Sequence, residues 1–167
     1  METELCKFCL KTGVLCPTCE EKVRSGKVGP SYMEVARLLL DLEAKGMSAL
    51  QQAHLLNVAD VGGVLVLVFK KGDLTHLRPI RGKLARLLEE KTGKKVHFME
   101  GDVSEREFLE QLFWPSRLLT INKVWLPDDT VETKVVLKGR RPWANVETLV
   151  QIAKELRGLS LRVEFMR

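Results

Sequence analysis

The chain has 167 residues, of which 45% are apolar, and it carries a formal net charge of +5. This length is long for one small domain and sufficient for two. The longest apolar stretch, residues 64–69, is far too short to span a membrane, so we expect a soluble cytoplasmic protein with no membrane partner. The positive charge is local, because residues 70–95 contain nine Lys or Arg against three Asp or Glu.

All four cysteines lie in the first nineteen residues, as two Cys-x-x-Cys pairs. Such pairs can place four thiolates about 2.3 Å from one Zn²⁺ in a tetrahedron, with no coordination position open for chemistry. Disulfides or a redox-active pair are the alternatives. A secreted disulfide scaffold would follow a signal peptide, whereas this chain starts with acidic residues, and a redox pair would lie in a βαβ unit. We therefore predict one structural zinc ion in a reducing compartment, held by Cys6, Cys9, Cys16 and Cys19.

In the first half, residues 20–30 mix charges with glycine and proline, as is typical of a hinge. A helix is predicted to begin after Ser31, which with Glu34 forms a capping-box pattern, and to end before Gly46. The other elements expected here are strands over 48–60, 64–69 and 95–99, a helical turn over 73–77, a tight connection over 79–82 and a helix over 83–92.

The order recurs in the second half, where Ser104 and Glu107 form another capping box. The elements expected here are helices over 104–112 and 145–156, strands over 118–126, 131–137 and 159–165, and a turn over 127–129. Both halves thus run helix, two strands, a polar connection, helix and strand. An internal duplication is the simplest explanation of this repeat.

Residues 67–98 resemble the core of a KH domain of the prokaryotic, type II kind. The resemblance rests on the spacing between Gly82 and Gly93, on the basic residues around the preceding loop and on the Gly-Lys-Lys-Val sequence that enters the last strand. With its second half, the chain resembles the tandem KH pair of archaeal NusA-like transcription factors, preceded by a zinc module. This resemblance implies an α+β fold with a zinc ribbon or knuckle (1–29, including a hinge), a first KH-like αββααβ domain (30–101) and a second, degenerate one (102–167).

The resemblance also implies binding of single-stranded RNA, without catalysis, in transcription elongation or termination or at the ribosome. Glycines in a Gly-x-x-Gly loop let the backbone approach sugar-phosphates. Here the loop has a proline in place of its first glycine, which removes one N–H donor, and nearby cations can compensate by contacting phosphates. Alternatively, the proline begins a helix and the cations form a solvated face. The predicted RNA-binding residues are Arg78, Pro79, Ile80, Arg81, Gly82, Lys83 and Arg86.

The second module lacks a glycine pair, but it contains Lys138, Arg140, Arg141 and Trp143 close together in the sequence. These residues can hold phosphates and stack one base, or contact a partner protein, and ordinary packing of Trp143 is the alternative. Trp114 and Trp125 are expected in the core, because apolar residues flank them.

Catalysis has no support in the sequence. The three histidines, at positions 54, 76 and 97, lack metal-ligand spacing with one another, and no phosphate-binding loop motif is present. Two functions are therefore consistent with the sequence. The first is a binder of single-stranded RNA, and the second is an adaptor that docks on RNA polymerase or the ribosome with little RNA affinity of its own.

Overall fold

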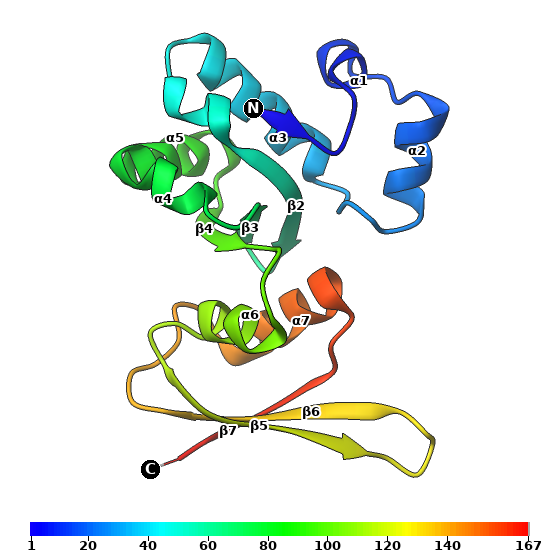
Figure 1. Ribbon diagram of the computed structural model, residues 1–167, viewed down its shortest axis with the longest axis vertical. Coiled ribbons are helices and arrows are strands. Elements are labelled where there is room, and N and C mark those ends of the chain that lie inside the picture. Colours follow the sequence, from blue (N-terminus) through cyan, green and yellow to red (C-terminus); the bar gives the residue numbers. More distant parts are fainter. Residues whose placement is uncertain (167) are drawn as a thin grey trace. The chain divides into compact units, whose positions relative to one another are not determined.

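The computed structural model describes residues 1–166 and divides into two compact units, Met1–Asp102 and Val103–Arg167. Each unit is a mixture of helices with one small sheet, so the predicted α+β class is confirmed (Figure 1). None of the helices in the described part of the chain is long and apolar enough to cross a membrane.

Unit 1 consists of a four-stranded sheet, the helices around it and the cysteine segment. Its sheet has the order β1-β2-β3-β4, in which β2 and β3 are antiparallel and the other two pairs are parallel. Its α-helices are α1 (Lys7–Thr12), α2 (Pro17–Arg24), α3 (Tyr32–Ala44), α4 (Asp73–Leu77) and α5 (Arg81–Thr92). Its strands and 3₁₀ helices are β1 (Glu2–Thr3), η1 (Ser48–Gln52), β2 (His54–Val61), β3 (Val64–Phe69), η2 (Arg78–Ile80) and β4 (Lys95–Glu100).

The core of unit 1 lies around β3, all six residues of which are buried as the apolar run predicts. The cysteine segment contributes to the same core. Leu5 and Leu10 are buried in one cluster with Tyr32, Leu39 and residues of the sheet. The apolar residues of the cysteine segment are therefore stabilised by packing against α3 and the sheet.

Two local expectations for this unit are wrong. Ser31 does not cap α3, because its backbone is already helical (φ −87°, ψ 0°) and its hydroxyl donates to Asp60 at 3.0 Å. An N-cap residue whose side chain accepts from the first turn typically has an extended backbone. The strand expected over 48–60 begins only at His54, since residues 48–52 form η1.

Unit 2 is a three-stranded sheet with both helices on one face (Figure 1). The order is β5-β6-β7, with β5 and β6 antiparallel and β6 and β7 parallel. Phe108 and Leu112 of α6 and Ile152 of α7 are buried with Val135 and Leu137 of β6. The elements are α6 (Glu105–Leu112), β5 (Arg117–Trp125), β6 (Val131–Lys138), α7 (Val146–Arg157) and β7 (Leu161–Phe165).

Both units contain a helix, an antiparallel hairpin, a second helix and a strand parallel to the second hairpin strand. Unit 1 has α4 and η2 between the hairpin and its last helix, whereas residues 139–145 of unit 2 form only bends and irregular backbone. The six-element αββααβ order expected for the second module is therefore incomplete. In unit 2 the N-cap of α6 is confirmed, since the hydroxyl of Ser104 accepts from the amide of Glu107 at 3.2 Å.

Candidate metal centre and cationic surfaces

The four cysteines converge, with their sulfur atoms all within 4.8 Å of one another. Each Cys-x-x-Cys pair starts a short helix. Cys6 and Cys16 are the extended residues that precede α1 and α2, and Cys9 and Cys19 lie in the first turns. Residues three apart at a helix start face the same side, so each pair presents two sulfurs to the same point. Pro17, as the first residue of α2, favours this start because its fixed φ is helical.

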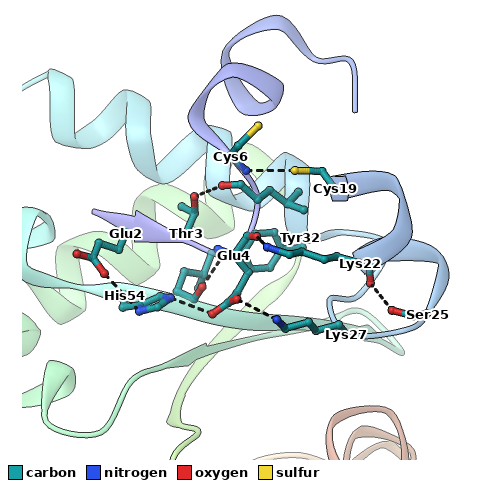
Figure 2. Close-up of polar contacts among 12 residues, drawn as sticks. Glu2, Thr3, Glu4, Cys6, Cys19, Lys22, Ser25, Lys27, Tyr32 and His54 are labelled. Carbon is teal, nitrogen blue, oxygen red and sulfur yellow. Dashed lines mark hydrogen bonds and ion pairs between the residues drawn. The ribbon is translucent and has the colours of Figure 1, made fainter. Parts of the chain in front are cut away.

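Backbone donors tie the two pairs together reciprocally. The amide of Cys6 donates to the sulfur of Cys19 at 3.3 Å, and the amide of Cys16 donates to the sulfur of Cys9 at 3.1 Å. Figure 2 shows the first of these contacts. The sulfurs of Cys6 and Cys9 lie 3.0 Å apart. Amide donors stabilise thiolates over thiols, and thiolates are the form that binds a metal.

The environments of the four cysteines shift their pKa values in opposite directions. A hydrogen bond from the Cys19 amide is the main cause that lowers the pKa of Cys16 to about 7, and hydrogen bonding with Cys9 lowers the pKa of Cys6. Hydrogen bonding with the Cys6 side chain raises the pKa of Cys9 to about 12, and burial raises the pKa of Cys19. Cys6 and Cys16 are therefore the more acidic cysteines, and Cys9 and Cys19 would have to lose their protons for all four to hold a metal ion.

The arrangement fits a metal with a closed shell of four thiolates. Tetrahedral Zn–S bonds of about 2.3 Å place the sulfurs about 3.8 Å apart, which is compatible with the clustering here. Within residues 1–166, no other group of three or more His, Cys, Asp or Glu side chains is placed to hold an ion. The four predicted ligands thus form a site compatible with a structural metal, and a closed shell provides no position for a substrate.

Glu4 connects the cysteine segment to the sheet (Figure 2). Its amide donates to the hydroxyl of Tyr32 at 2.8 Å, and that hydroxyl donates to the carbonyl of Leu55 in β2 at 2.5 Å. Lys22 in α2 donates to the Glu4 carbonyl at 2.6 Å, and His54 contacts the Glu4 carboxylate at 3.0 Å. Burial raises the pKa of Tyr32 above its usual range, so its hydroxyl stays a neutral donor.

The cations predicted to bind RNA in unit 1 lie within nine consecutive residues, from η2 into the first turns of α5. Arg78, Arg81, Lys83 and Arg86 are all exposed, and none forms an ion pair with another described residue. The guanidinium of Arg81 lies over the ring of Phe98, 5.6 Å from its centroid, which positions that side chain. We call these four residues the α5 surface.

The backbone beside the α5 surface differs from the expected tight connection. Pro79 lies inside the 3₁₀ turn η2, Ile80 is half-buried and packs against the core, and Gly82 is the second residue of α5. Gly82 needs no positive φ, and a Cβ there would have no atom within 4 Å. The chain thus passes from α4 through η2 into α5 almost without interruption, and the surface above Gly82 is open.

In unit 2, Lys138, Arg140 and Arg141 are exposed, whereas Trp143 is half-buried. The indole N–H of Trp143 donates to the carbonyl of Leu112 at 2.7 Å, so the side chain is fixed against the end of α6. The three cations are thus exposed within four consecutive residues, and Trp143 is a packed neighbour in the sequence.

The core positions expected for two tryptophans are wrong. Trp114 is 63% exposed at the end of α6, and Trp125 is 75% exposed at the end of β5. β7 pairs only with residues 133–137 of β6, so the far end of the β5–β6 hairpin has no third strand beside it. Apolar neighbours in the sequence could not show that this end of the hairpin lacks cover. Phe8 is also exposed, at 71%, between the first two cysteines.

No family model matches the chain, and no curated protein matches it either. Among solved structures, the crystal structure of APE1850, an archaeal protein, resembles it with a TM-score of 0.44 and 18% sequence identity. The similarity covers 62% of this chain and 79% of the other. A likeness this distant identifies neither a shared family nor a shared function, so the proposals below rest on the residues of this chain.

Proposed function

We propose that this protein binds single-stranded RNA through the α5 surface. The observation that carries the proposal is that four neighbouring cations are exposed and none is neutralised by a carboxylate of the described chain. Had they been ion-paired or covered, a phosphate backbone would have had to displace those contacts first. Free cations instead offer their charge directly to phosphates, and counterion release then drives binding.

The open backbone at Gly82 lets a nucleic acid strand approach α5 closely, because no side chain lies within 4 Å of the position a Cβ would occupy. Pro79 contributes no N–H, so side chains rather than loop amides supply most contacts. Binding of this kind depends mainly on phosphates and tolerates different base sequences. We expect log K to fall by about 0.7 per log unit of salt for each phosphate contacted on a single strand.

We further infer that the two units are KH-like modules of type II and that the protein acts in transcription elongation or termination or at the ribosome. The shared order of helix, hairpin, helix and parallel strand supports this interpretation. The absence of a glycine pair between residues 139 and 145 makes unit 2 the degenerate module. In this proposal the protein is a binding protein without catalysis, in the cytoplasm.

We assign the four-cysteine site to one structural Zn²⁺. The support is the donor set, since four thiolates favour zinc over magnesium or calcium, which prefer oxygen ligands. Cys6, Cys9, Cys16 and Cys19 would hold the ion, and it would supply crosslinking of α1 to α2. Native mass spectrometry and elemental analysis test the assignment, and a stoichiometry of one zinc per chain is expected.

The RNA proposal is tested by replacing Arg78, Arg81 and Lys83 together with Glu and measuring the affinity for a labelled single-stranded RNA by anisotropy. The affinity should fall at least about tenfold, and the salt dependence should become shallower. The matched control replaces Arg24, Lys45 and Arg106 with Glu, which changes the net charge equally.

These control cations are exposed and already have carboxylate partners. Equal losses of affinity in both triple variants would mean that net charge, rather than the α5 surface, governs binding. An unchanged affinity in the α5 triple variant would place the RNA elsewhere.

A protein-interaction adaptor is the second candidate, and the exposed end of the β5–β6 hairpin favours it. Trp125 and Val124 are exposed there beside Asp128 and Asp129, and carboxylates repel RNA. Its expected signature is saturable, salt-resistant binding to one protein of the polymerase or the ribosome. Purification from native lysate with and without ribonuclease separates the candidates, because only RNA-bridged partners are lost after digestion.

A further inference from the structure

Four cations meet at one end of the sheet in unit 2. Arg117 begins β5 and Lys138 ends β6, and the two are direct partners in the antiparallel ladder. Arg140 and Arg141 follow two and three residues after Lys138. All four are exposed, and none forms an ion pair with a residue in the described range. The segments 114–118 and 138–144 contain no Asp or Glu.

The pairing of Arg117 with Lys138 is unfavourable within the protein. Directly opposed residues have Cβ atoms about 4.5–5.5 Å apart, and like charges at that distance destabilise a sheet. The next pair, Leu118 with Leu137, is buried beneath the helices, so Arg117 and Lys138 lie on the opposite, open face. Glu164, on the same open face, pairs with Lys134 instead at 3.3 Å. The repulsion between Arg117 and Lys138 is not offset within the described chain, so an anion bound from outside would reduce it.

An exposed aromatic side chain belongs to the same end of the unit. The amide of Trp143 donates to the carbonyl of Trp114 at 3.0 Å, and the hydroxyl of Ser116 donates to the carbonyl of Arg140. These contacts hold the connection that enters β5 against the connection that leaves β6 (Figure 1). Trp114 is 63% exposed, whereas the indole N–H of Trp143 is bonded to Leu112. The indole of Trp114 is therefore available for stacking, and the amide of Trp143 holds the backbone of Trp114 in place.

We propose that this end of unit 2 is a second binding site for single-stranded RNA. Arg117, Lys138, Arg140 and Arg141 contact successive phosphates, and Trp114 stacks on a base. An indole beside four unpaired cations suits a strand that has both charge and unstacked bases, whereas a polyanion without bases would leave the indole unused. The inference rests on the proposed RNA-binding function and assigns stacking to Trp114 in place of Trp143.

The first test uses full-length, metal-loaded protein and a labelled oligouridylate, with affinity measured by anisotropy at several salt concentrations. Trp114→Ala should weaken binding about tenfold, and Trp114→Phe should retain most of it, since a phenyl ring still stacks. Trp125→Ala is the matched control, because Trp125 is also largely exposed in the same unit but lies at the acidic end of the hairpin. Its affinity should equal that of the wild type.

The second test is Lys138→Glu. The proposal predicts that this substitution raises the stability of unit 2 and lowers the affinity for RNA. The substitution replaces a repulsive pair with an attractive one opposite Arg117, so the thermal midpoint of unit 2 should rise. RNA affinity should fall, and the slope of log K against log salt should become shallower by at least about 0.7. A purely structural role of Lys138 would instead move stability and affinity in the same direction, which would overturn the proposal.

The outcomes separate this site from the α5 surface. If Trp114→Ala and Lys138→Glu leave affinity unchanged while the α5 triple variant loses it, the second site is refuted and the proposed function stands. If the wild type binds no oligouridylate, the proposed function itself fails, and this inference fails with it. If inorganic polyphosphate competes as well as RNA and Trp114→Ala changes nothing, the surface binds any polyanion and the stacking role is refuted.

Discussion

Replacing Tyr32 with Phe should destabilise unit 1 through two hydrogen bonds. Tyr32 is fully buried, and its hydroxyl joins the amide of Glu4 to the carbonyl of Leu55 at 2.8 and 2.5 Å. Phenylalanine fills the same space but leaves both backbone groups without this partner. An unsatisfied buried donor or acceptor costs about 1–3 kcal/mol, so for two such groups the free energy of unfolding should fall by about 2–6 kcal/mol.

The same substitution should be sensitive to the metal. Under the proposed zinc assignment, removing the metal frees the four thiolates and forfeits on the order of 10 kcal/mol of metal-coupled folding. The segment carrying Glu4 then loses its position, and Leu5 and Leu10 leave the core of unit 1. After chelation only the bond to Leu55 remains to be lost, so the effect of Tyr32→Phe should shrink to about half.

The two units can be monitored separately. All three tryptophans, at positions 114, 125 and 143, lie in unit 2, so tryptophan fluorescence follows that unit while far-UV circular dichroism follows both. Urea titrations of the wild type and of Tyr32→Phe, each with and without chelator, then give four free energies of unfolding. A loss under about 0.5 kcal/mol, or equal losses with and without metal, would contradict the role given to Tyr32. The fluorescence transition should be unchanged throughout.

Three further outcomes are expected. Asn145→Ala removes the side-chain oxygen that accepts from the amide of Thr148 at 2.8 Å, so unit 2 should lose about 1 kcal/mol in a fluorescence-detected urea titration. Gly101→Ala would place a Cβ 2.7 Å from a methyl carbon of Val68, so unit 1 should lose about 1–3 kcal/mol by circular dichroism. Metal affinity should fall as pH falls: the pKa of Cys9 is raised, to about 12, so its thiol stays protonated at neutral pH, and each added proton competes with the ion. Competition with a chromophoric chelator between pH 8 and pH 5 measures this, and a pH-independent affinity would show that the thiolates are not the ligands.

Patterns that depend on near neighbours were predictable from the sequence. The spacing of the cysteines places two sulfurs at each of two helix starts, and the structure brings all four within 4.8 Å. The all-apolar run at 64–69 is the buried central strand β3, and the N-cap at Ser104 is present. In each case the controlling interaction spans a few residues, so the local sequence specifies it.

Ser31 and Ser104 show that the same local sequence pattern can have two different structural outcomes. Both begin a capping-box pattern, yet Ser31 donates to Asp60, 29 residues away, and does not cap its helix. Trp114 and Trp125 also have apolar neighbours, yet both are exposed, because no element of unit 2 covers them. Whether a partner exists at a distant position is a property of the tertiary structure.

The sequence by itself determined the four candidate metal ligands, the α+β class and the concentration of positive charge, since these follow from spacing, periodicity and composition. Only the tertiary structure decided which cations stay free of carboxylates and that Arg117 lies opposite Lys138. It also decided that Trp114, rather than Trp143, exposes its indole. The physical reason is that burial and pairing depend on which strands and helices meet, and that contact joins residues the sequence keeps apart.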